Sequence, residues 1–117
     1  MAQLFFKKHL QDAIRAGTKR TTIRRWPRAM LGAGGRAWAP GLGFLAIEAV
    51  EAVDLDNLTD ADAVADGFET IVELRLVLHT LYPDHATDGK QWFRIFFQSP
   101  PEAKSASGVD DIQAQLF

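Results

Sequence analysis

The chain contains no cysteine among its 117 residues. This absence excludes disulfide bonds, thiolate metal sites and a cysteine nucleophile. The three histidines, His9, His79 and His85, do not have the spacing of metal ligands, so we expect no metal site and no cofactor. Any chemistry is therefore expected from hydroxyl, amine, guanidinium and carboxylate groups.

Long apolar runs are missing as well. No segment approaches the roughly 20 consecutive apolar residues that span a bilayer. The first ten residues, MAQLFFKKHL, hold only a short apolar run, and their lysines follow it instead of preceding it, unlike a secretory signal peptide. We therefore expect a cytoplasmic protein without a membrane partner.

Basic residues are scarce after residue 40. Residues 1–40 hold nine of the 13 Lys and Arg residues and a single acid, whereas residues 41–117 hold the other four and 14 acids. The formal charges of the two parts are therefore +8 and −10. Such an asymmetry predicts a positive surface for an anionic partner, nucleic acid or nucleotide first of all. Alternatively, the two parts neutralise each other in the folded chain.

Short periodic segments separated by turn residues predict one α+β domain over residues 1–98, with a small curled sheet or barrel. The tail, residues 99–117, begins with a Ser-, Pro-, Ala- and Gly-rich linker. A helix is expected over Lys7–Ala16, and two more are expected after the N-cap residues Thr59 and Thr70. The expected strands are Leu4–Phe6, Arg20–Arg25, Arg36–Ala39, Gly43–Asp54 and Lys90–Gln98, the last of them central and buried.

The segment Gly17–Arg25, GTKRTTIRR, concentrates a lysine, three arginines and three threonines directly after the first expected helix. Gly17 fits the left-handed position just past a helix C-terminus. On the strand that follows, alternation places Arg20, Thr22 and Arg24 on one face. This segment is the strongest candidate for holding an anion or moving a proton.

The order of motifs resembles the ASCH domain family. The resemblance spans residues 4 to 98 and rests on G-x-K-x-x-T-x-R after a helix, L-T-x-x-x-A-x-x-[DE]-G-F, a helix ending in Y-P, and a W-F-x-I-x-F strand. It implies a PUA-like β-barrel of about five to six strands flanked by three short helices. It also implies that RNA or a nucleoside binds in a cleft beside the first motif.

Some bacterial members of that family hydrolyse the acetyl amide of N4-acetylcytidine with a lysine, a threonine and a glutamate. By position these residues correspond to Lys19, Thr22 and Asp66, the last with a side chain one methylene shorter. Thr22 would be the nucleophile or proton shuttle, Lys19 the base, Asp66 the orienting carboxylate, and Arg24 a holder of negative charge.

A lysine acts as a base only if its pKa falls towards neutrality, which burial and nearby cations both favour. The arginines next to Lys19 supply such charge. On an ideal strand Lys19 and Thr22 would face opposite ways, so the mechanism requires a turn at Lys19, which Gly17 makes possible.

Two other functions remain open at this point. A non-catalytic RNA-binding module would need only a basic edge and a stacking ring, for which the candidates are Arg20, Arg24, Arg25 and Trp26. A single-stranded RNA ribonuclease is the third possibility, since other family members are reported as ribonucleases.

The last five residues, QAQLF, resemble the pentapeptide with which bacterial proteins bind the sliding clamp, through Gln113, Leu116 and Phe117. Alternatively, these apolar residues fold back onto the protein's own surface.

Overall fold

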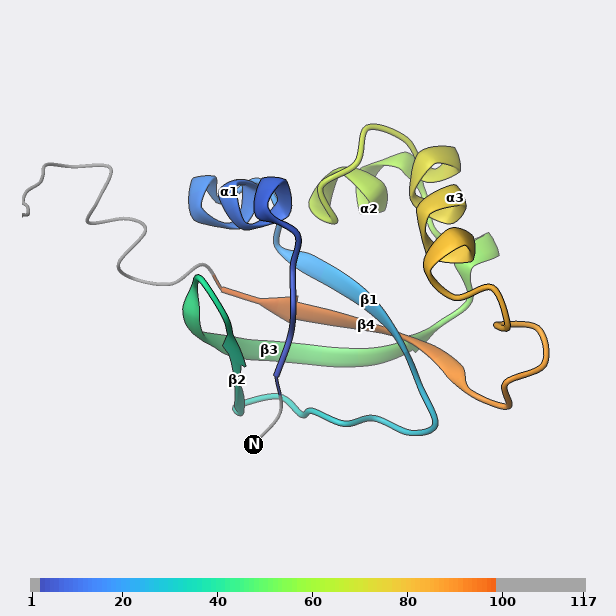
Figure 1. Cartoon of the computed structure of the whole chain (residues 1–117), viewed down its shortest axis with the longest axis horizontal. Coiled ribbons are helices and arrows are strands. Elements are labelled where there is room, and N and C mark those ends of the chain that lie inside the picture. The colour runs from blue at the N-terminus through green and yellow to red at the C-terminus, as the bar shows by residue number, and fades with distance from the viewer. Residues whose placement is uncertain (1–2, 99–117) are drawn as a thin grey trace, which may run out of the picture.

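The computed structural model describes residues 3–98. Four strands, β1 (Thr21–Trp26), β2 (Arg36–Ala39), β3 (Gly43–Val53) and β4 (Gln91–Phe97), form one antiparallel sheet in the order β1-β4-β3-β2. The helices are α1 (Lys8–Ala16), α2 (Asp60–Ala65) and α3 (Ile71–Leu81), with a short 3₁₀ turn, η1 (Leu55–Asn57), before α2. In Figure 1, α1 lies beside the beginning of β1, and α2 and α3 lie together farther along it.

The expected α+β class is confirmed, but the strand count was too high, because residues 3–98 contain four strands and not five or six. The segment expected as the strand Leu4–Phe6 makes only an isolated parallel bridge, between Gln3 and Trp38, and a 2.9 Å bond from the Leu4 amide to the Trp38 carbonyl. It is too short for a ladder because α1 begins at Lys8. The sheet therefore curls into a half-barrel.

Capping residues and strand composition in the sequence correctly predicted where α2 and α3 begin and that β4 is central. Thr59 forms the predicted capping box with Asp62 at the start of α2, and Thr70 caps α3 by accepting a bond from the Glu73 amide. β4, rich in aromatic residues, is central in the sheet, since it pairs with both β1 and β3. Within the described residues no helix has the length and apolar character needed to cross a membrane.

The two faces of the sheet are covered by different elements. Inside the half-barrel, Phe93, Ile95 and Phe97 of β4 pack with Leu4, Ile14 and residues of β2 and β3. On the other face, Ile23 of β1 packs with Leu55, Ala63, Leu74 and Leu78 from η1, α2 and α3. β1 is an edge strand, so its free side lies where these two layers meet.

We predict that Ile95→Ala lowers the free energy of unfolding by about 2–5 kcal/mol, because Ile95 is completely buried on the central strand and the truncation leaves a cavity. Urea unfolding measures the change. Leu76→Ala on α3, where the side chain is 68% exposed, is the control and should change it by less than about 0.5 kcal/mol. Equal losses in the two variants would contradict this description of the core.

Candidate active site

The turn required at Lys19 is present. Gly17 has a φ of +83°, a left-handed conformation that costs glycine little because it has no Cβ. The amides of Thr18 and Lys19 both donate to the Ala13 carbonyl, at 3.0 and 3.2 Å, and so reverse the chain at the end of α1. As a result the Lys19 side chain turns inward, and only 2% of Lys19 is exposed.

The Lys19 amine lies against the end of α2. Its Nζ donates to the backbone oxygens of Thr21 at 2.8 Å and Asp66 at 2.6 Å, and lies 3.4 Å from Asp66 Oδ2. Asp66 is the C-cap residue of α2, so the amine provides a donor and positive charge where a helix presents unpaired carbonyls. The next residue, Gly67, has a φ of +95° and packs on the lysine stem.

The carboxylate of Asp66 is held from its other side by Thr21. Thr21 Oγ1 donates to Asp66 Oδ1 at 2.9 Å, and both residues are buried, with 1% and 3% of their surface exposed. Each oxygen of the carboxylate therefore has its own partner, Thr21 for Oδ1 and Lys19 for Oδ2. The three residues form a buried cluster whose polar groups bond to one another, because buried polar groups need hydrogen-bond partners in place of water.

Burial shifts both charged groups towards their neutral forms. It lowers the pKa of Lys19 below the usual value of a lysine, and the charge of Arg24 lowers it further, while Asp66 opposes the change. Burial also raises the pKa of Asp66, against the attraction of Lys19. The amine can therefore give up its proton more readily than a lysine on the surface.

The hydroxyl of Thr22 is paired with an arginine. Arg24 Nε donates to Thr22 Oγ1 at 3.0 Å, which agrees with the expectation that the two side chains share one face of β1. The same guanidinium donates through Nη2 to the Phe5 carbonyl at 2.9 Å and lies 5.0 Å from the centre of the Phe6 ring. Arg24 thus bridges the open side of the half-barrel, between β1 and the N-terminal segment.

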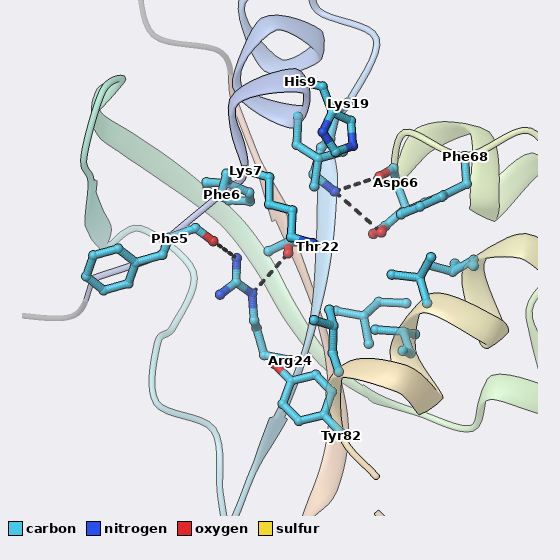
Figure 2. Close-up of a pocket in the computed structure, with 16 residues that line it drawn as sticks. Phe5, Phe6, Lys7, His9, Lys19, Thr22, Arg24, Asp66, Phe68 and Tyr82 are labelled. Atoms are coloured by element: carbon cyan, nitrogen blue, oxygen red, sulfur yellow. Dashed lines mark hydrogen bonds and ion pairs between the residues drawn. The ribbon is translucent and has the colours of Figure 1, made fainter.

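These groups line one pocket of about 400 Å³ (Figure 2). Lys19, Thr22, Arg24 and Asp66 form its polar part. Apolar and aromatic side chains from the N-terminal segment, α1, α3 and the residues on either side of α3 form the remainder, among them Phe6, Leu10, Phe68, Leu74, Leu78 and Tyr82. A cavity of this size, with a few convergent polar groups in an apolar lining, has the character of a small-molecule site.

The other expected ligand-binding residues lie elsewhere. Arg25 points to the opposite face of β1, where it pairs with Asp88 at 3.1 Å and lies 4.6 Å from the centre of the Trp92 ring. Trp26 packs on Phe93 with ring centres 5.8 Å apart, and Arg20 lines a different cavity next to α2. None of the three is among the residues that line the pocket.

Sequence reasoning did not find Thr21, Phe6 or Tyr82 as parts of the site. Strand alternation puts Thr21 on the face away from Thr22, and the packing of α2 against that face is what brings Asp66 to it. Tyr82 had a signal, the Y-P pair that ends α3, but its place in the pocket depends on how α3 packs.

Three solved structures resemble this one. A protein of the DUF984 family from Enterococcus faecalis superposes with a TM-score of 0.63 at 15% sequence identity, over 85% of this chain and 80% of that one. Two mutants of ZmASCH from Zymomonas mobilis each superpose with a TM-score of 0.51, at 17% and 16% identity. Both cover 95% of this chain, and 82% and 84% of theirs.

The fold is ASCH-like. This agrees with the family resemblance noted in the sequence, and identities of this size establish the fold alone. No family model matches the chain, and no curated protein matches it in sequence.

We predict that Lys19→Met lowers the free energy of unfolding by about 3–5 kcal/mol, because it leaves the buried Asp66 without its cation. In Lys19→Met/Asp66→Asn the loss should be smaller than the sum of the two single losses. The measurement is a double-mutant cycle by urea unfolding.

The control for this cycle is the exposed pair of Lys8 and Asp12, which lie 2.8 Å apart. Lys8→Met should leave the unfolding midpoint almost unchanged, since solvent screens this pair. Strictly additive losses for Lys19 and Asp66 would mean that the two groups do not interact.

Proposed function

We propose that this protein binds a modified nucleoside in the Lys19 pocket and hydrolyses its exocyclic acetyl amide, as in N4-acetylcytidine. The observation that carries the proposal is the convergence of a buried amine, a threonine hydroxyl and a carboxylate on one pocket of nucleoside size. The same three positions correspond to the working groups that the ASCH resemblance implies.

The contacts of Lys19 are compatible with a neutral amine. Its two short bonds go to backbone oxygens and need only the two hydrogens of a neutral –NH₂ group. The contact with Asp66 Oδ2 is longer, at 3.4 Å, and is the one that deprotonation would release. The nitrogen lone pair could then accept a proton from a group in the pocket.

In the first step, Thr22 Oγ attacks the acetyl carbonyl carbon and its proton passes to the Lys19 amine. Arg24, which already donates to Thr22 Oγ1, stabilises the negative charge that develops during attack. Collapse of the tetrahedral intermediate breaks the C–N bond. The cytidine amine leaves with the proton from Lys19, and the acetyl group remains as an ester on Thr22.

In the second step, water attacks the acetyl ester while Lys19 takes a proton from it. The ester bond breaks, the proton returns to Thr22 Oγ, and acetic acid leaves. The bond to the Asp66 carbonyl oxygen orients the amine throughout, and Thr21 fixes the Asp66 side chain. The apolar lining of the pocket limits the access of bulk water and so keeps the pKa of Lys19 low.

To test this, the purified protein is incubated with N4-acetylcytidine and, separately, with single-stranded RNA, and the release of cytidine, acetate and RNA fragments is followed. We expect cytidine and acetate in equal amounts. Fragments without deacetylation would identify a ribonuclease, and an absence of every product would reject catalysis.

We predict that Thr22→Val lowers kcat by about 10³-fold or more, because it removes the hydroxyl and keeps the shape. Thr22→Ser keeps the hydroxyl and should remain within about tenfold of the wild type. The control is Thr18→Val, since Thr18 is exposed and binds only the Ala13 carbonyl through its hydroxyl. Comparable turnover by Thr22→Val and Thr18→Val would remove Thr22 from the mechanism.

We also predict that kcat/KM rises with pH. The base works only as a neutral amine, and neutral Lys19 increases as the pH passes upward through its pKa. Because burial lowers that pKa, the midpoint should lie below the ordinary lysine value of about 10.4. A rate that falls across the same range would require an acid and not a base at this position.

A non-catalytic RNA-binding module is the second candidate. It is favoured by one observation, that the described hydrogen bonds of the Lys19 amine go to Thr21 and Asp66 and not to the Thr22 hydroxyl. Salt separates the two functions. A neutral nucleoside should bind with little salt dependence, whereas RNA held by its phosphates should weaken steeply as salt increases.

A further inference from the structure

The outside of the half-barrel carries exposed aromatic side chains on β2 and β3 that do not line the pocket. On β2 and β3, Trp38 lies directly opposite Phe44, and their ring centres are 5.0 Å apart in an edge-to-face arrangement. The guanidinium of Arg36 lies 4.1 Å from the centre of the Phe44 ring. Trp38 and Phe44 are 37% and 36% exposed, although their neighbours Ala37, Ala39 and Leu45 are fully buried.

The N-terminal segment extends this group to the pocket. Gln3 pairs with Trp38 in a parallel bridge, and Leu4, next in the chain, points into the core with 1% exposure. By alternation Phe5 points outward, as Trp38 does, and its ring is 63% exposed. We call Phe5, Arg36, Trp38 and Phe44 the outer aromatic surface.

Phe5 joins this surface to the pocket. Its carbonyl oxygen accepts the bond from Arg24 inside the pocket, whereas its ring is turned away from Lys19 and Asp66 (Figure 2). Phe5 therefore belongs both to the lining of the pocket and to the exposed side chains of the outer aromatic surface.

The chemistry of the surface favours a single-stranded nucleic acid over an apolar protein partner. Unpaired bases stack on aromatic rings and on guanidinium planes, and both are present in the stack of Arg36 on Phe44. The four residues carry one positive charge and no negative one. Phe5, Arg36 and Trp38 belong to the first 40 residues, whose formal charge is +8.

We propose that the outer aromatic surface binds the nucleotides next to the one in the pocket, so that the ligand is a single-stranded nucleic acid and not only a free nucleoside. Bases would stack on Phe5, Trp38 and Phe44, and Arg36 would contact a backbone phosphate. This deepens the proposed function and rests on it for the occupant of the pocket, but the surface can be tested by binding alone.

The probe is a short, fluorescently labelled single-stranded RNA without acetylation, titrated by anisotropy at several salt concentrations, with DNA of the same sequence as a second arm. We expect Trp38→Ala to weaken binding at least about fivefold, since stacking one base contributes this much or more. Arg36→Gln should weaken it too and lower the slope of log Kd against log salt by about one.

Two matched controls lie away from the surface. Lys90→Gln removes an exposed charge just before β4, in the loop at the end of the molecule opposite β2 (Figure 1), and Leu76→Ala removes an exposed apolar side chain from α3. Both should bind the RNA as the wild type does. Because Arg36 is exposed, Arg36→Gln keeps the test valid even if Trp38→Ala unfolds.

A loss of RNA affinity in Trp38→Ala and Arg36→Gln, but not in the two controls, supports the inference. Tighter binding of RNA than of DNA would also indicate that the protein contacts the 2′-hydroxyl groups. No binding of either strand at low salt, wild-type affinity in both variants, or equal losses in the controls would overturn the inference. Turnover of free N4-acetylcytidine is scored separately. Turnover of the free nucleoside without RNA binding at the outer aromatic surface would overturn this inference and leave the proposed function intact. RNA binding at that surface without turnover would support this inference and contradict the proposed function.

Discussion

The burial of the Lys19 amine against the C-terminal end of α2 is the interaction on which the rest of the site depends. A lysine is seldom buried, because its ammonium loses the solvation of water. Here two backbone oxygens and the Asp66 carboxylate replace that solvation. The bond to the Asp66 carbonyl ties α2 to the segment before β1, and the bond from the Arg20 amide to the Ala65 carbonyl, at 2.7 Å, reinforces it.

The half-barrel explains why the pocket lies where it does. A closed barrel would pair β1 along both sides, but among residues 3–98 β1 pairs along one side only, with β4. Arg24 spans the other side by a hydrogen bond to the Phe5 carbonyl. A cavity therefore lies between β1 and the N-terminal segment, where a closed barrel would have a ladder of backbone hydrogen bonds. The polar cluster forms one wall of this cavity, and side chains of the N-terminal segment and α3 form the other walls.

Much of the local structure could be predicted because its causes are local. The cap at Thr59 and the left-handed turn at Gly17 depend on residues close by in the chain, and so do the strand boundaries near β2 and β3. Lys19, Thr22 and Asp66, which the family motif singles out, all line one pocket. The strand count could not be predicted in the same way, because Leu4–Phe6 has the composition of a strand but makes only an isolated bridge before α1 begins at Lys8.

By itself the sequence determined where the helices begin and end, which face of β1 carries Thr22 and Arg24, and that the basic residues gather in the first 40 positions. Only the tertiary structure decided which of these basic residues reach the pocket. Arg25, one position beyond Arg24, alternates to the opposite face and pairs with Asp88, 63 residues away. It also decided that Thr21 would hold Asp66, because that contact requires α2 to pack across β1, and the partner of a buried polar group is set by packing between elements distant in the chain.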